Sequence, residues 1–190
     1  MTAERAAYHH GDLPRAVLAA ALDVIATEGP AALSLRGLAR RAGVSHAAPA
    51  HHFGDRAGLL TAIATEGYGL LSVTLGQAGD LRDLGMRYVR FAIAHPAHFQ
   101  VMFRPELLRP DDPELRAARE RTRDRLRVAV AGYADDPAVG FMAAWSMAHG
   151  FASLLLSRNL DGLLDGRDPE EAFRALTGEM FRPAEDSATG

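Results

Sequence analysis

Residues 34–53 restrict the fold more than any other part of the chain, because they predict two short helices joined by a tight turn. Leu35 and Leu38 begin an apolar helical face. Gly43 ends that helix, since glycine adopts the left-handed cap conformation without steric cost. Ser45 follows and can cap a second helix through its hydroxyl. An apolar helix, a glycine turn and a capped short helix form the pattern of a helix-turn-helix.

The second helix of this pattern, expected over residues 46–52, offers little to a hydrophobic core. Alanine and histidine dominate it, and Phe53 is the only large apolar side chain within residues 46–53. The window 34–56 carries four arginines and one carboxylate, in a chain whose net charge is −3. These features favour a helix that enters the DNA major groove. The alternative is an ordinary helical hairpin inside a bundle.

The order of these residues resembles the N-terminal domain of the TetR family of bacterial transcriptional regulators over residues 12–68. The match runs from Leu13 through an alanine-rich helix to Gly29, and then through residues 35–45, 51–56 and 59–60. The resemblance implies a dimeric regulator that binds a palindromic double-stranded DNA operator, acts as a repressor and responds to a ligand. Two departures, Pro49 and Ala50, stand where relatives often carry leucine and tyrosine, and they bear on the strength of DNA binding.

Helix ends and the resemblance together predict the DNA contacts. Ser34 and Ser45 lie at expected helix N-termini, where a hydroxyl and free amides suit a phosphate oxygen. The resemblance places Arg36 and Arg56 at the DNA backbone, and residues 46–48 are expected to read bases. The complete expected set is Ser34, Arg36, Ser45, His46, Ala47, Ala48, His51, His52 and Arg56.

The remainder of the chain resembles one branch of the family, in which the regulatory domain carries a Trp-x-x-x-His-Gly motif, here Trp145, His149 and Gly150. Large apolar residues with a few polar groups are the usual composition of a small-molecule site. A small apolar or amphipathic ligand is therefore expected, although a filled core is the alternative. The expected lining is Tyr88, Phe91, His95, Phe99, Met102, Phe103, Phe141, Trp145 and His149.

Residues 137–157 contain no Asp, Glu, Lys or Arg. This uncharged run is formally long enough to span a bilayer. Because the run is rich in Ala, Gly and Ser and contains His149, we expect a buried helix rather than a membrane span. In a dimeric regulator such a helix belongs to the subunit interface. The expected interface residues are Phe151, Leu154, Leu155, Phe173 and Leu176.

The periodicities predict an all-α chain of nine helices, comprising a three-helix helix-turn-helix head and a helical bundle for ligand binding and dimerisation. The expected divisions are a head at 1–56, a regulatory domain at 57–182 and a disordered tail at 183–190. The helix that begins near residue 55 belongs to both domains. Three later helices are expected to begin at Asp-Pro pairs, because Asp caps free amides and Pro fixes φ in the first turn.

Composition narrows the remaining classes of function. The chain has no cysteine, which excludes disulfides, a thiol nucleophile and cysteine zinc sites. No catalytic residue, cofactor or metal is predicted. A metal site formed by His95, His98 and His149 is the alternative, but it lacks an obvious carboxylate partner. A cytoplasmic location is expected. An all-helical histidine enzyme and a protein-interaction module remain the alternatives to a DNA-binding regulator.

Overall fold

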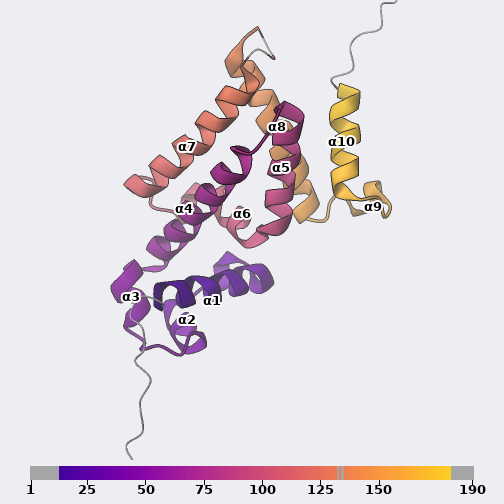
Figure 1. Cartoon of the computed structure of the whole chain (residues 1–190). Coiled ribbons are helices and arrows are strands. Elements are labelled where there is room, and N and C mark those ends of the chain that lie inside the picture. Colours follow the sequence, from indigo (N-terminus) through magenta and orange to yellow (C-terminus); the bar gives the residue numbers. More distant parts are fainter. Residues whose placement is uncertain (1–12, 132, 134, 181–190) are drawn as a thin grey trace, which may run out of the picture. The chain divides into compact units, whose positions relative to one another are not determined.

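Helices are the only regular elements in the part of the chain that the computed structural model describes, residues 13–131, 133 and 135–180 (Figure 1). This confirms the predicted all-α class. The expected disordered tail, 183–190, lies outside the described residues. The α-helices are α1 Leu13–Glu28, α2 Leu35–Arg41, α3 Ala48–Phe53, α4 Arg56–Leu75, α5 Leu81–Ala94, α6 Pro96–Met102, α7 Pro113–Val130, α8 Pro137–Leu156, α9 Asp161–Leu164 and α10 Pro169–Met180.

The described residues contain ten α-helices and two 3₁₀ turns, η1 Pro30–Ala32 and η2 Pro105–Leu107, so the expected count of nine helices was wrong. The additional helix is α9, a single turn between α8 and α10. The Asp-Pro starts are confirmed. Asp112, Asp136 and Asp168 each accept a backbone N–H from the first turn of α7, α8 and α10, at 2.8–2.9 Å.

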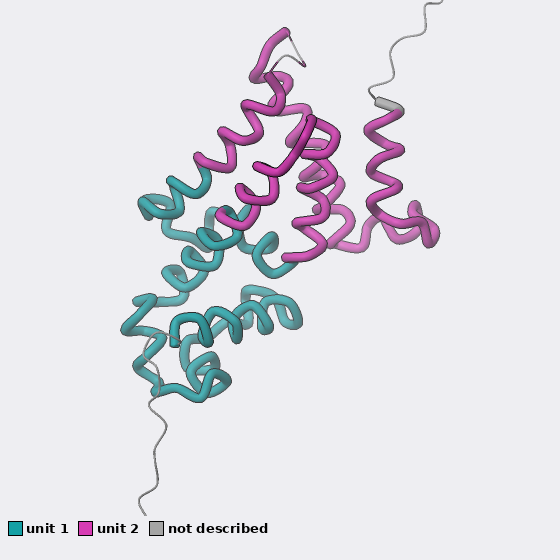
Figure 2. Tube along the Cα trace, viewed as in Figure 1, with its two compact units in different colours: residues 1–68, 96–119 teal, residues 69–95, 120–190 magenta. Residues whose placement is uncertain are grey.

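Contacts divide the chain into two compact units (Figure 2). Of the described residues, unit 1 comprises those up to Tyr68 together with Pro96–Arg119, and unit 2 comprises Gly69–His95 and those from Glu120 onwards. The predicted boundary after residue 56 separates DNA binding from regulation, whereas the two units are groups of contacting residues. That boundary therefore stays a prediction. Both α4 and α7 contribute residues to both units.

Unit 1 has its core where α1, α2 and α3 contact one another and α1 also contacts α6. Its buried residues recur at helical spacing on α1 and α4, as amphipathic helices require. Burying each large aliphatic side chain contributes about 1.5–3 kcal/mol before the entropy cost of folding. The fully buried side chains include Val17, Ile25, Leu38, Leu59, Leu60, Ile63, Val101, Met102 and Leu115.

Unit 2 is organised around α5, which contacts both α8 and α10. Tyr88, Phe91 and Phe173 are at most 3% exposed and lie in its core. Two helices, α4 and α8, are long and apolar enough to span a membrane, which alone is weak evidence for a span. They differ in burial, because 56% of the apolar stretch of α4 is buried but only 11% of that of α8. The α8 helix therefore presents an uncovered apolar surface.

Candidate functional site

The α2 helix and its following turn are fixed by local hydrogen bonds. Ser34 Oγ accepts the Gly37 N–H at 3.1 Å and caps the helix. At the other end Gly43 has φ +66°. The Val44 N–H donates to Ala39 O at 3.0 Å, and the Gly43 N–H donates to Arg40 O at 3.3 Å. This pair of bonds is a Schellman motif, and it sets the direction in which the chain leaves α2.

The α3 helix begins two residues later than the sequence suggested, at Ala48 instead of residue 46. The predicted Ser45 side-chain cap is wrong, because the N-cap position is Ala47 and carries no side-chain hydrogen bond. Proline explains the shift, since its ring favours the first turn of a helix and Pro49 occupies that turn. Its missing N–H is then one of the amides that no helical carbonyl reaches.

The outward surface of the helix-turn-helix carries most of the predicted DNA-binding residues. Only Pro49 and Phe53 of α3 are buried, so the helix attaches to the core through two side chains. Arg36 is exposed and makes no ion pair with any residue that the structure describes. Exposed members of the predicted set are Ser34, Arg36, Ser45, His46, Ala47, His51 and His52, whereas Ala48 and Arg56 are half-buried.

Arg56 has an internal partner that the sequence did not indicate. Its Nη2 donates to Pro30 O at 2.7 Å, which ties the start of α4 to η1. Its Nε is buried without a hydrogen-bond partner among the described residues. The guanidinium therefore holds the head together, and a phosphate contact from Arg56 would require this bond to be shared.

The turn between α3 and α4 is held by an arginine from the segment after α6, within unit 1. Asp55 Oδ1 accepts the Gly58 N–H at 2.8 Å, and Arg109 Nη2 lies 3.1 Å from the same oxygen. The Gly58 amide and then Arg109 lower the pKa of Asp55. Arg109 also donates its backbone N–H to Thr61 Oγ1 at 2.9 Å. Sequence reasoning missed Arg109, because no local pattern marks a contact over this separation.

The residues predicted to line a ligand pocket fall in both units. Phe99, Met102 and Phe103 belong to unit 1, where Phe99 and Phe103 have ring centroids 5.0 Å apart. Tyr68 donates its hydroxyl to Met102 O at 2.8 Å in the same cluster. The other members belong to unit 2 and are Tyr88, Phe91, His95, Phe141, Trp145 and His149.

Four of the unit 2 residues form a continuous row of rings along α8 and α5. Centroid separations are 6.0 Å for Phe141 and Trp145, 5.9 Å for Trp145 and His149, and 6.2 Å for His149 and Tyr88. The Tyr88 hydroxyl and His149 Nδ1 are 2.8 Å apart and share a hydrogen bond. A hollow of about 450 Å³ borders Phe141 and Trp145. Burial lowers the pKa of His149.

The depressed pKa of His149 predicts a pH dependence of stability. Because the folded chain favours neutral His149, the unfolded chain binds more protons below about pH 6.5, and the free energy of unfolding falls as the pH falls. We expect wild type to lose more stability than His149→Gln between about pH 8 and pH 5.5 in urea unfolding. The exposed-residue variant His46→Ala should lose as much as wild type. Equal losses in wild type and His149→Gln would contradict this.

The predicted dimer residues divide into core and surface. Phe173 is 1% exposed, lies 5.1 Å from the Phe151 ring and packs over Gly85. A side chain buried this way within one chain cannot meet a partner, so its expected surface role is corrected to a core role. Leu154 and Leu176 are 45% and 38% exposed and remain available.

The fold and the turn geometry define a helix-turn-helix protein with an appended helical domain. Residues 17–63 match the family model described as bacterial regulatory proteins, tetR family, and residues 81–180 match the model described as Tetracyclin repressor-like, C-terminal domain. The chain therefore belongs to the TetR family of bacterial transcriptional regulators, whose N-terminal domain binds DNA. These matches do not show whether the chain belongs to the branch of the family that carries the Trp-x-x-x-His-Gly motif.

Solved structures share this fold. A protein of unknown function from Rhodococcus sp. RHA1 is 32% identical, with a TM-score of 0.77, and the match covers 93% of this chain and 97% of that one. The TetR family regulator PfmR from Thermus thermophilus is 24% identical, with a TM-score of 0.67 and coverages of 89% and 98%. AibR, solved with isovaleryl coenzyme A and operator DNA, is 19% identical, with a TM-score of 0.69 and coverages of 90% and 98%. No curated protein matches the chain.

Proposed function

We propose that this chain is a ligand-responsive repressor that binds a palindromic operator as a homodimer in the cytoplasm, without enzymatic activity. The observation that carries the proposal is the outward face of the helix-turn-helix. Arg36 and Arg40 are exposed there and make no ion pair with any described residue, while Arg41 pairs with Glu28 at 2.8 Å. Exposed histidines flank them on α3 and the preceding turn. Such a surface suits phosphate contacts around a groove-facing helix.

A salt titration of binding to promoter DNA next to the protein's own gene tests this proposal. Binding by a cationic helix-turn-helix releases counterions, so log affinity should fall linearly with log salt. A histidine enzyme or a protein-interaction module would bind neither the promoter fragment nor a scrambled fragment. Absence of binding at low salt would therefore refute the proposed function.

Two single variants should separate phosphate contacts from base contacts. Arg36→Ala should weaken operator and random DNA similarly and reduce the salt slope by about 1, because phosphates carry little sequence information. His46→Ala should change base preference, by about 1 kcal/mol at the contacted base pair. Arg174→Ala on α10 is a matched control for loss of one exposed arginine. A changed preference in Arg36→Ala, with His46→Ala unaltered, would contradict the assigned register.

Dimerisation through α8 and α10 is supported by the exposed apolar surface of α8. The proposed interface comprises Phe151, Leu154 and Leu155 of α8 and Leu176 of α10, with Phe173 supporting it from the core. A dimer would hold two recognition helices about one turn of DNA apart, about 34–36 Å. Burial at this interface also explains why α8 carries no charged residue, so that no membrane span is needed to explain its composition.

Ligand response is supported by the ring row and its polar end at His149 and Tyr88. A ligand that prefers one body conformation shifts the spacing of the two heads, and its effect is limited by its differential affinity for the two states. We expect a binding ligand, sought in a panel of small organic acids, to change Trp145 fluorescence and lower operator affinity over the same concentration range. His149→Ala should shift both midpoints together. Separate midpoints in the wild type would refute coupling.

A further inference from the structure

The turn between α3 and α4 carries a negative charge close to the proposed DNA-binding surface. Asp55 is the only acidic residue between Glu28 and Glu66, and its side chain is 64% exposed. It follows the exposed His52 by three positions, so the two Cα atoms are at most about 11 Å apart. This separation is close to the Debye length of about 10 Å at 0.1 M salt, so screening between them is incomplete. An unpaired Asp55 would therefore repel the phosphates of DNA bound at α3.

Asp55 is paired with a cation from outside the helix-turn-helix. Its Oδ1 accepts the Gly58 N–H at 2.8 Å and lies 3.1 Å from Arg109 Nη2. The Gly58 amide, and then Arg109, lower the pKa of this carboxyl. An ordinary aspartate is already ionised at neutral pH, so loss of Arg109 would leave Asp55 charged and without its arginine partner.

Two glycines leave the space in which the Arg109 guanidinium lies. A Cβ on Gly54 would be 3.1 Å from Arg109 Nη2, and a Cβ on Gly58 would be 3.1 Å from Arg109 Cζ. The main chain of this segment is anchored as well. Leu108 is 7% exposed, and the Arg109 N–H donates to Thr61 Oγ1 at 2.9 Å. The structure therefore holds the guanidinium at the turn, while 48% of the side chain stays exposed.

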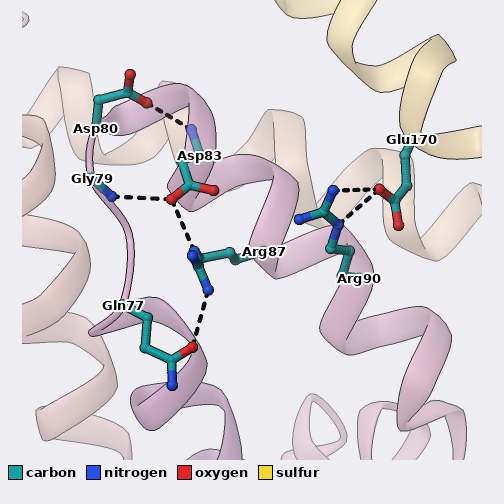
Figure 3. Close-up of polar contacts among 7 residues, drawn as sticks. All are labelled: Gln77, Gly79, Asp80, Asp83, Arg87, Arg90 and Glu170. Carbon is teal, nitrogen blue, oxygen red and sulfur yellow. Dashed lines mark hydrogen bonds and ion pairs between the residues drawn. The ribbon is translucent and has the colours of Figure 1, made fainter.

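A pair of the same kind in unit 2 has a purely local explanation. Asp83 accepts the Gly79 N–H at 3.0 Å and Arg87 Nε at 2.9 Å (Figure 3). This carboxylate and its arginine are one turn apart on α5, where such a pair stabilises the helix itself. Arg109 is far from Asp55 along the chain. It is also not needed to cap α4, because the bond from Asp55 to the Gly58 N–H already does so.

We propose that Arg109 neutralises Asp55 and thereby allows the helix-turn-helix to approach DNA phosphates. Arg109 is then a positioning residue that acts through Asp55, and the inference rests on the proposed DNA-binding function. Repulsion by a carboxylate at this turn is independent of base sequence, so Arg109 contributes to affinity and not to base preference. For a charge about 8 Å from a phosphate, the loss of neutralisation weakens a dimer with two heads by about threefold to tenfold at low salt.

Binding of the full chain to its promoter fragment and to a scrambled fragment tests the proposal with Arg109→Gln, Asp55→Asn and the double variant. Arg109→Gln should weaken both fragments about threefold to tenfold at about 0.05 M salt. At about 0.4 M salt the loss should shrink to about twofold or less, because the added charge is screened. The double variant restores a neutral turn and should bind within about twofold of wild type. Its asparagine oxygen can still accept the Gly58 N–H, so the cap of α4 is retained.

Arg87→Gln is the matched control, because it removes the arginine from the similar pair in unit 2, and it should bind both fragments as wild type does. Unchanged binding by Arg109→Gln would overturn the proposal. A loss of equal size at both salt concentrations that Asp55→Asn fails to reverse would also overturn it, since Arg109 would then only hold the turn together. Wild-type binding at low salt, measured in the same titrations, distinguishes either result from failure of the proposed DNA-binding function.

Discussion

Gly58→Ala is expected to destabilise the chain by about 1–3 kcal/mol, the usual range for overpacking. A Cβ at this position would overlap the carbonyl oxygen of Phe53, and it would also lie 3.1 Å from Arg109 Cζ. Because the obstacle is backbone, no side-chain rotation relieves it, and the α3–α4 turn must move. We therefore expect a lower midpoint in urea unfolding together with weaker operator binding.

Gly69→Ala provides the matched control on the same helix. Nothing lies within 4 Å of a Cβ built on Gly69, and the residue is inside α4. Alanine should therefore stabilise the helix by about 0.5–1 kcal/mol. Unfolding of Gly58→Ala at the same urea concentration as Gly69→Ala would show that the α3–α4 turn is not closed in the way described.

Leu154→Glu is expected to separate the proposed dimer and to lower operator affinity by about 10²–10⁴-fold. A buried carboxylate at a subunit interface is costly, and a monomer loses the gain from engaging two half-sites at once. Sedimentation at micromolar concentration should show wild type as a dimer and the variant as a monomer. Affinity for a single half-site should change little.

Val73→Glu is the control for this experiment, because Val73 is 65% exposed on α4 and lies outside the proposed interface. It should remain dimeric and bind the operator as wild type does. A monomeric wild type, or a dimeric Leu154→Glu variant with full affinity, would contradict the proposed interface.

Local patterns predicted the parts of the fold that depend on neighbouring residues. The Gly43 turn and the Asp-Pro starts each rely on bonds within a few residues, and the structure contains them. The Ser45 cap failed for a local reason too, since Pro49 in the first helical turn moved the start of α3. The prediction gave more weight to the capping preference of serine than to the preference of proline for the first helical turn. The proline decided where α3 begins.

Contacts between residues far apart in the chain could not be predicted from local sequence patterns. Arg109 reaches Asp55 across 54 positions, and nothing in its own neighbourhood marks it. Periodicity showed that Phe173 is apolar and on one face of its helix, but it could not distinguish a surface against a partner from a surface against α5. The same limit applies to Arg56, whose partner Pro30 is 26 positions away.

The attachment of α3 through Pro49 and Phe53 has a consequence for how operator preference can diversify. Outward positions 46, 47, 50 and 51 are exposed, so substitutions there are decoupled from the stability of the scaffold, whereas the exposed His52 ring also packs against the buried Phe53 ring at 4.7 Å. Gene duplicates of such a chain can acquire new target sequences by changing only these positions, while the cap, the glycine turn and the core stay constant. For the protein engineer, they form a compact library in which altered specificity is selected without compensating mutations elsewhere.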